Sequence, residues 1–233
     1  MSRDSRLDRF GFLPRLDPAI AIMPARQVLL WPMLGEVPDD FVLYGGTALA
    51  LRLGHRESVD FDFFSTEPFN PTELLEQLGS FGRATVNRST ANNLEFTAGE
   101  VNFSFFGGMR IQSVAEPSVV ASNGLVVASL FDLAGAKAKA ILDRSEWRDY
   151  VDIATLLEHG LELSEIVGYA TTIFAPVFEF PASVFLRSLA YFEEGTARDV
   201  PDDMRREIEA AVVRMAWDQI PVVEPSSQTL LPS

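Results

Sequence analysis

Apolar positions along the chain follow two different periods. As far as about residue 128, short apolar or alternating runs are separated by Gly, Asn and Pro, which is typical of strands. From Ser129 onward, apolar residues recur at every third or fourth position, which is typical of helices packed on one side. The pattern predicts an α+β fold: a mixed sheet with helices over 25–128, followed by a helical region over 129–220.

The boundaries of the predicted elements follow from these runs and from the residues that break them. Strands are expected at 41–44, 59–63, 83–88, 93–97, 101–106 and 124–128. Helices are expected at 25–34, 48–53, 71–78, 129–144, 147–159, 164–172, 182–192 and 202–217. The Pro-containing segments 1–24 and 221–233 are expected to be loosely ordered arms.

The most informative stretch is residues 41–65, FVLYGGTALALRLGHRESVDFDFFS. Its apolar strand ends at Gly45 and Gly46, where the chain can turn because glycine tolerates positive φ. Thr47 is expected to cap the helix that follows, and Gly54 to end it. Backbone N–H groups then converge at the start of this helix and form a candidate phosphate site.

Two carboxylates follow on the next strand. Residues two apart on a strand share a face, so Asp60 and Asp62 are expected on one side, with Val59, Phe61 and Phe63 in the core. Paired acids repel unless a cation lies between them, and Mg²⁺ or Mn²⁺ bound to oxygen ligands is the candidate. The alternative, two surface carboxylates on an edge strand, fits less well with the interleaved Phe and Val.

These motifs resemble a known superfamily. Gly45, Gly46 and Thr47, followed by Ser58 and then Asp-x-Asp, resemble the signature of the DNA polymerase beta-like nucleotidyltransferases. The longer stretch GGTALALRLGHRESVDFDFFS, residues 45–65, resembles the AbiEii/AbiGii-type nucleotidyltransferase toxin family of bacterial toxin–antitoxin and abortive-infection systems. The resemblance implies a polymerase beta-like core and a Mg²⁺-dependent transfer of a nucleoside monophosphate from an NTP to an acceptor hydroxyl.

A second block, AKAKAILDRSEWRDYVDIATLL, resembles the segment that follows the sheet in AbiEii-type proteins. Matched residue by residue, it gives Lys137, Arg144, Asp149 and Asp152. The resemblance implies that Lys137 contacts the triphosphate and that Asp149 helps to assemble or deprotonate the acceptor site. The residues alone leave other interpretations open, because Lys137 could cover apolar surface and Asp149 could pair with Arg144 or Arg148.

The predicted roles combine both blocks. The nucleotide would be bound by Gly45, Gly46, Thr47, Ser58, Lys137 and Arg144. The metal would be bound by Asp60 and Asp62, and the catalytic set would be Asp60, Asp62, Lys137 and Asp149.

The chain departs from the superfamily at one position. Many of its enzymes carry a third carboxylate on a neighbouring strand, where this chain offers Asn102 and Ser104. That difference is compatible with a one-metal mechanism, with Asp149 as a replacement ligand, or with an inactive descendant.

The amino-acid composition and net charge exclude several classes of function. The 233 residues include no cysteine and only two histidines, which excludes thiol chemistry and Cys-ligated zinc. A formal charge of −14 argues against indiscriminate nucleic-acid binding, so an RNA acceptor would need a local basic patch. Arg52, His55 and Arg56 could contribute to one, although a solvated helix end is an equal alternative. No apolar run approaches the ~20 residues of a membrane span, so a cytoplasmic protein without a membrane partner is expected.

The leading functional prediction is the toxin of a two-gene system. Its partners would be an NTP, a tRNA 3′ end or another RNA acceptor, and a cognate antitoxin from a neighbouring gene. The main alternative is a catalytically degenerate nucleotide-binding module that acts through a protein partner. A glycosyltransferase, which also uses Asp-x-Asp, is disfavoured because it does not require the upstream glycine turn.

Overall fold

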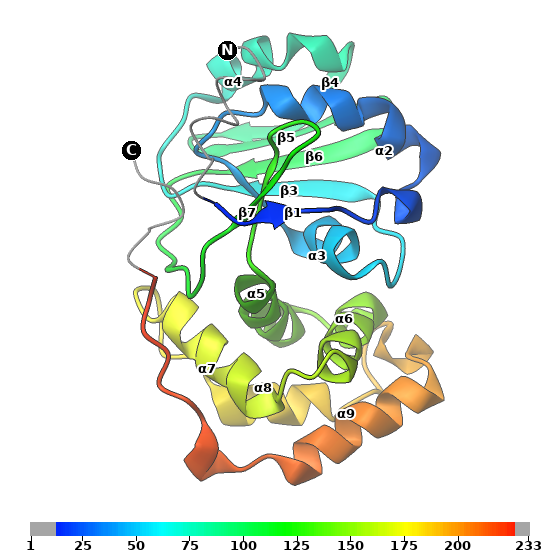
Figure 1. Ribbon diagram of the computed structural model, residues 1–233, viewed down its shortest axis with the longest axis vertical. Coiled ribbons are helices and arrows are strands. Elements are labelled where there is room, and N and C mark those ends of the chain that lie inside the picture. The colour runs from blue at the N-terminus through cyan, green and yellow to red at the C-terminus, as the bar shows by residue number, and fades with distance from the viewer. Residues whose placement is uncertain (1–12, 227–233) are drawn as a thin grey trace. The chain divides into compact units, whose positions relative to one another are not determined.

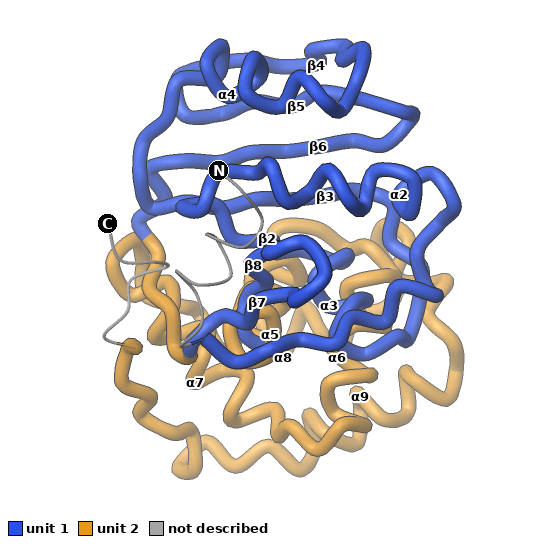
Figure 2. The backbone as a smooth tube through the Cα atoms, turned by 45° about the horizontal axis from the view of Figure 1, so that its top comes forward, with its two compact units in different colours: residues 1–110, 116–129, 228–233 blue, residues 111–115, 130–227 orange. Residues whose placement is uncertain are grey.

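The computed structural model describes residues 13–226, and these residues divide into two compact units (Figure 2). Unit 1 contains residues 13–110 and 116–129. Unit 2 contains residues 111–115 and 130–226. The short segment 111–115 therefore belongs to unit 2, although it lies between two stretches of unit 1 in the sequence.

Unit 1 is built on one eight-stranded sheet (Figure 1). Its strands are β1 (Arg15–Leu16), β2 (Val42–Tyr44), β3 (Asp60–Phe64), β4 (Ala84–Thr90), β5 (Asn93–Ala98), β6 (Val101–Phe106), β7 (Ser118–Val120) and β8 (Val126–Val127). Their spatial order is β1-β7-β8-β2-β3-β6-β5-β4. Three pairs are parallel (β1 with β7, β2 with β8, β3 with β6) and the other four are antiparallel, so the predicted mixed sheet is confirmed.

Helices accompany the sheet in unit 1 and make up unit 2. Unit 1 has α2 (Ala25–Leu30), α3 (Gly45–Leu53) and α4 (Pro71–Gln77), with 3-10 turns η1 (Ile20–Ile22), η2 (Trp31–Glu36) and η3 (Gly79–Phe81). Unit 2 has α5 (Leu130–Asp143), α6 (Trp147–Glu158), α7 (Leu163–Phe174), α8 (Ala182–Leu189) and α9 (Asp202–Arg214), with η4 (Ala197–Asp199) and η5 (Trp217–Gln219). Helix α5 packs against α6, α7 and α8, and the predicted α+β fold class is confirmed.

One face of the sheet is a core of aromatic rings. Phe61 stacks on Phe103 with ring centroids 5.3 Å apart, and Phe63 stacks on Phe105 at 4.7 Å. All four side chains are fully buried, because alternate residues of β3 and β6 point to the same side. Aromatic rings bury large apolar areas and stack with definite geometry, so this face fixes the register of β3 against β6.

A buried acid at the start of α5 binds segment 111–115 to the helices of unit 2. Asp132 accepts hydrogen bonds from Ser113 Oγ at 2.8 Å and from the Val114 backbone N–H at 2.8 Å. Both donors lie in segment 111–115, so this segment satisfies a carboxylate that is almost completely buried.

Several local expectations were wrong. Helix α3 begins at Gly45 directly after β2, not at residue 48. Val59 lies just before β3 and is 46% exposed, so it is not part of the core. The two short strands β1 and β7 were not expected at all. Residues 1–12 and 227–233, the outer parts of the two predicted arms, lie outside the described residues.

Candidate functional site

The sheet register brings the diglycine beside the aspartates. Strands β2 and β3 are antiparallel, and Tyr44, the last residue of β2, is paired with Asp62. Gly45 follows Tyr44 and is the first residue of α3. The N-terminus of this nine-residue helix therefore lies next to Asp62, which is the contact that the spacing of the motif predicts.

Gly45 cannot be replaced without displacing Asp62. Its φ is +73°, in the left-handed region that L side chains avoid. A Cβ atom added to Gly45 would lie 2.5 Å from Oδ2 of Asp62. The absence of a side chain is what lets the carboxylate approach the helix N-terminus.

Gly46 is equally crowded, by a hydroxyl and a guanidinium. A Cβ atom at Gly46 would lie 2.9 Å from Ser58 Oγ and 2.9 Å from Arg56 Nη2. Arg56 also donates through Nη1 to the Glu57 carbonyl at 2.9 Å. Donor groups of Arg56 and Ser58 thus meet the first turn of α3, where backbone N–H groups lack helical partners.

Thr47 has a different place from the one expected. It lies inside the first turn of α3, is buried, and donates its hydroxyl hydrogen to the backbone carbonyl of Asp60. The predicted capping role is wrong, since the position before the helix is Tyr44, which makes no side-chain cap. Thr47 instead fastens α3 to the strand that carries the two acids.

Asp60 and Asp62 lie on the face of β3 opposite the aromatic core. They are half-buried, whereas Phe61 and Phe63 between them are fully buried. Oδ1 of Asp60 accepts a hydrogen bond from Asn102 Nδ2 at 2.9 Å. The predicted alternation of the strand is therefore correct for these four residues.

The residues present fit a divalent cation with few protein ligands. Within residues 13–226 no group of three or more His, Cys, Asp or Glu side chains could hold a metal ion, so Asp60 and Asp62 would be its only acidic ligands. Mg²⁺ is characteristically held by one or two carboxylates and completes its shell with water and substrate phosphates. The oxygen donors of β3 match that kind of site.

The second predicted block forms a buried charge cluster inside unit 2. Lys137 Nζ lies 2.9 Å from Asp149 Oδ1 and 2.6 Å from Asp152 Oδ2. Arg144 Nε lies 2.8 Å from Asp149 Oδ2. Lys137, Asp149 and Asp152 are buried, whereas the Arg144 side chain is 52% exposed. The structure therefore brings all four matched residues of this block together.

The pKa of Asp149 reflects these contacts. Burial acts to raise the pKa of its carboxyl, and the charges and hydrogen bonds of Lys137 and Arg144 lower it. The net result is a pKa below the usual value, so Asp149 is ionised at neutral pH. An acid held this way is a weak proton acceptor.

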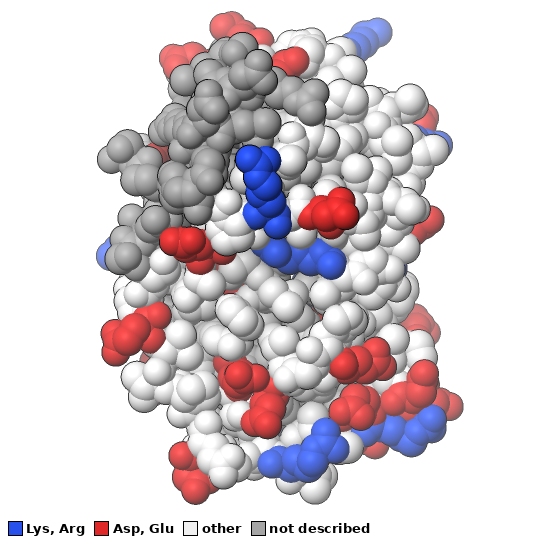
Figure 3. Space-filling view, in the orientation of Figure 1, with Lys and Arg blue, Asp and Glu red and all other residues white. Residues whose placement is uncertain are grey.

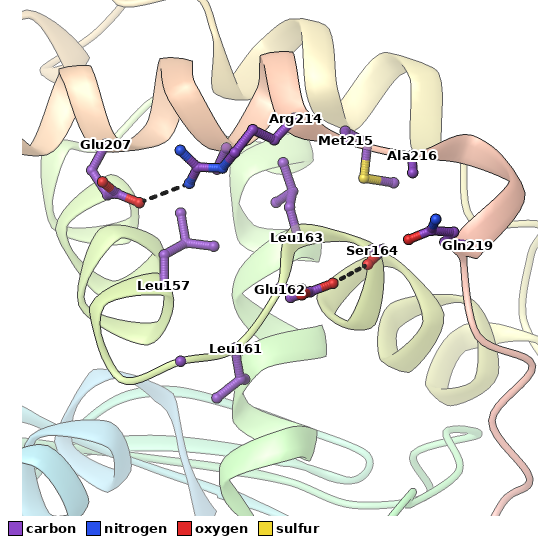
Figure 4. Close-up of a pocket in the computed structure, with 12 residues that line it drawn as sticks. Leu157, Leu161, Glu162, Leu163, Ser164, Glu207, Arg214, Met215, Ala216 and Gln219 are labelled. Atoms are coloured by element: carbon purple, nitrogen blue, oxygen red, sulfur yellow. Dashed lines mark hydrogen bonds and ion pairs between the residues drawn. The ribbon is translucent and has the colours of Figure 1, made fainter.

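A separate pocket lies in unit 2 (Figure 4). Its volume is about 430 Å³, and it is lined by the end of α6, the start of α7, and residues of α9 and η5. Glu207 and Arg214 form an ion pair of 3.2 Å at its wall. None of the predicted site residues lines this pocket.

Two residues were not assigned to the site from the sequence. Arg56 was considered only as part of a basic patch, yet its guanidinium lies against Gly46. The sequence feature that could have identified it is the Arg-x-Ser-x-Asp spacing that leads into β3. Asn102 was noted only as the residue where a carboxylate was expected, yet it binds Asp60. The sequence feature that could have identified Asn102 is the alternation along β6, which places Asn102 and Ser104 on the other face of the sheet from Phe103 and Phe105.

Comparison with solved structures shows which class of protein shares this fold. The chain is similar to a proposed nucleotidyltransferase from Helicobacter pylori, with a TM-score of 0.52 and 18% identity over 81% of this chain and 92% of that one. It is also similar to JHP933 from Helicobacter pylori, with a TM-score of 0.51 and 16% identity over 84% and 90%. The fold is that of a nucleotidyltransferase.

The family is shown by the sequence itself. Residues 33–226 match the family described as "Nucleotidyl transferase AbiEii toxin, Type IV TA system". This chain belongs to the AbiEii nucleotidyltransferase toxin family, which confirms the resemblance found in its motifs. An uncharacterized protein of Aquifex aeolicus (strain VF5), aq_aa25, is 33% identical over 159 residues, covering 67% of this chain and 75% of that protein.

Over residues 13–226, none of the helices combines the length and the apolar character needed to cross a bilayer.

Proposed function

We propose that this chain transfers a nucleoside monophosphate from an NTP to an acceptor hydroxyl. The observation that supports it best is the contact between Gly45 and Asp62: a Cβ atom at Gly45 would lie 2.5 Å from Asp62 Oδ2. A helix N-terminus suits phosphate oxygens, and a carboxylate pair suits a cation that bridges to them. The family membership supports the same reaction class.

The proposed reaction needs positioning more than covalent chemistry from the protein. The acceptor hydroxyl loses its proton to solvent, its oxygen bonds to the α-phosphorus, and pyrophosphate leaves with the electrons of the broken bond. Backbone N–H groups of Gly45 and Gly46, with Ser58 and Arg56, would hold the triphosphate. Aligned donors of this kind stabilise charge as it develops on the phosphate oxygens.

Asp60 and Asp62 are the proposed metal ligands. A Mg²⁺ or Mn²⁺ ion bound there would supply charge neutralisation on the phosphates and lower the pKa of the attacking hydroxyl. Thr47 holds the strand that carries both acids, because its hydroxyl binds the Asp60 carbonyl.

For the cluster in unit 2 we propose positioning roles. Asp149 is ionised and bound to both Lys137 and Arg144, which favours an anchor over a proton acceptor. Lys137 is buried between Asp149 and Asp152, whereas half of the Arg144 side chain reaches solvent. Of the two predicted phosphate contacts in this block, Arg144 is therefore the one we favour.

An RNA acceptor, such as a tRNA 3′ end, stays part of the proposal. Basic side chains adjoin near the middle of the described face in Figure 3, and elsewhere on that face they lie among Asp and Glu. Affinity for a phosphate backbone comes mainly from Lys and Arg, and the chain has a formal charge of −14. We therefore expect recognition to be confined to a few nucleotides at the reacting end, with modest dependence on salt.

The toxin–antitoxin description of the family leads us to propose a cognate antitoxin as the biological partner. The expected setting is a two-gene arrangement in the cytoplasm. Expression of this chain alone should slow bacterial growth, and co-expression of the adjacent gene should restore it.

The activity is tested by incubating the full chain with each α-labelled NTP, Mg²⁺ and total cellular RNA. Label should move to RNA with the parent and not with Asp62→Asn. Glu76→Gln is the matched control, because Glu76 is an exposed carboxylate on α4 of the same unit and is not on the sheet that carries Asp62. Its transfer rate should equal that of the parent.

The other outcomes separate the alternatives. NTP binding without transfer to RNA or to protein would favour the degenerate nucleotide-binding module. Absence of NTP binding by a folded parent would contradict both interpretations, and so would full activity of Asp62→Asn.

A further inference from the structure

A row of polar side chains crosses the sheet toward Asp60. Asp60 on β3, Asn102 on β6 and Thr97 on β5 are register partners, so their side chains share one face. Thr97 Oγ1 donates to Asn102 Oδ1 at 2.9 Å, and Asn102 Nδ2 donates to Asp60 Oδ1 at 2.9 Å. The row therefore ends on one of the two proposed metal ligands.

An irregularity in β4 provides the first member of the row. The register between β4 and β5 shifts between Val86 and Arg88, which leaves Asn87 as the extra residue of a bulge. Asn87 Nδ2 donates to Thr97 Oγ1 at 2.8 Å. Bulges re-aim side chains and occur often beside functional sites, which fits a bulge whose extra residue extends this row.

The direction of the row follows from its last acceptor. An ionised carboxylate accepts hydrogen bonds only, so Asn102 must present its NH₂ group to Asp60. The Asn102 oxygen then faces Thr97, whose hydroxyl must donate to it and can accept only from the Asn87 NH₂ group. All three hydrogen bonds therefore run one way, and they hold the Asn102 amide with its nitrogen toward Asp60.

This orientation limits what Asp60 can offer a cation. Oδ1 accepts one hydrogen bond from Asn102, and the amide nitrogen that donates it cannot bind a metal ion. Oδ2 of Asp60 makes no hydrogen bond or ion pair with any residue in the described range 13–226. Asp60 therefore offers a cation its carboxylate oxygens only, and Asn102 adds no oxygen ligand because its Oδ1 accepts from Thr97.

We propose that Asn102 is a positioning residue that restricts the Asp60–Asp62 pair to a single divalent cation. The inference rests on the proposed function, because it assumes that these two acids hold the metal. Sites with two metal ions need ligands for both, commonly bridging carboxylates, and a register partner of Asp60 lies about 5 Å away across the strands. A carboxylate at residue 102 would supply the missing oxygens.

The test is a Mn²⁺ titration of the full chain, with free Mn²⁺ measured by electron paramagnetic resonance and no nucleotide present. We expect one Mn²⁺ per chain for the parent and two for Asn102→Asp. Thr85→Asp is the matched control, because Thr85 on β4 is the register partner of Thr97 and carries the same added charge to the same face, away from Asp60. It should bind one.

The titration separates this inference from the function it rests on. Two ions per parent chain, or one ion in Asn102→Asp, would overturn the role of Asn102 and leave the metal site intact. Loss of all binding in the parent, or binding unchanged in Asp62→Asn, would overturn the proposed metal site as well. Should Asn102→Asp not fold, judged by circular dichroism, Asn102→Glu brings the same chemistry and is expected to bind two.

Discussion

The ammonium of Lys137 lies 2.6 Å from Oδ2 of Asp152, and neither side chain is more than 7% exposed. Lys137 also binds Asp149, so a single buried cation is shared by two buried acids. Ionised groups are expensive to remove from water, and only close pairing compensates for that loss. The cluster is therefore cooperative: removing the lysine affects both acids at once.

Lys137→Met should destabilise unit 2 by about 3–5 kcal/mol, because Asp149 and Asp152 lose the buried cation that they share and Asp149 keeps only the half-exposed Arg144 as its cation. The loss is measured as a shift of the urea unfolding midpoint at pH 7. Lowering the pH toward 4 should narrow the difference from the parent, since an unpaired acid can take up a proton. Lys139→Met is the control: Lys139 lies on the same helix and pairs with the exposed Asp143, so its effect should stay below about 1 kcal/mol. An equal effect of the two substitutions would contradict the cluster's role.

The pKa of Asp149 gives a prediction with a definite sign. Its folded-state pKa lies below the unfolded value of about 3.9, so its ionisation stabilises the fold above that pH. The contribution is lost as the pH falls toward the folded-state pKa. The stability difference between the parent and Asp149→Asn should therefore be constant from pH 7 to about 5 and shrink below pH 4. A difference that grows on acidification would show that the carboxyl is not held ionised.

Gly45→Ala should impair both folding and nucleotide binding. A positive φ costs a non-glycine residue about 1–3 kcal/mol, and the added Cβ would press on the Asp62 carboxylate. We expect a lower urea midpoint and loss of NTP binding by isothermal titration calorimetry. Gly79→Ala is the matched control, since a Cβ there meets nothing within 4 Å and its φ is not positive. Normal NTP affinity in Gly45→Ala would argue against a phosphate site at the start of α3.

Arg56→Ala tests the phosphate contact that we add to the site. A hydrogen bond to a charged group contributes about 1.5–3 kcal/mol, so NTP affinity should fall by about 10- to 100-fold while stability changes little. Arg56→Lys should recover part of the affinity because it keeps the charge but not the planar fork. Arg83→Ala, at an exposed residue of the same unit, should bind NTP as the parent does. Unchanged affinity in Arg56→Ala would exclude the contact.

The sequence predicted those features that depend on local pattern. The strand that carries Asp60 and Asp62, the helix after the diglycine and the helical second half all follow from periodicity and from Gly positions, and the structure confirms them. Strand β1 could not be found this way, because it is only two residues long and is defined by its pairing with β7.

The contacts of the site required the tertiary structure. Helical spacing placed Lys137 on the apolar side of its helix, but it could not show that Asp149 and Asp152 lie on either side of its ammonium. Asn102 was recognised as a missing carboxylate, yet its hydrogen bond to Asp60 depends on a register between strands 42 residues apart in the sequence. The periodicity of the sequence shows which face of a strand or helix a side chain occupies. The pairing of strands and helices in the fold determines which residues that side chain contacts.

The assignment of residues 111–115 to the helical unit decides how the protein can be divided in the laboratory. A fragment that starts at Leu130 would contain every helix from α5 to α9 but would strip Asp132 of the donors from Ser113 and Val114. A dissection at the apparent boundary should therefore yield insoluble or molten material, whereas a fragment that begins at Ile111 and replaces 116–129 by a short flexible link retains both donors.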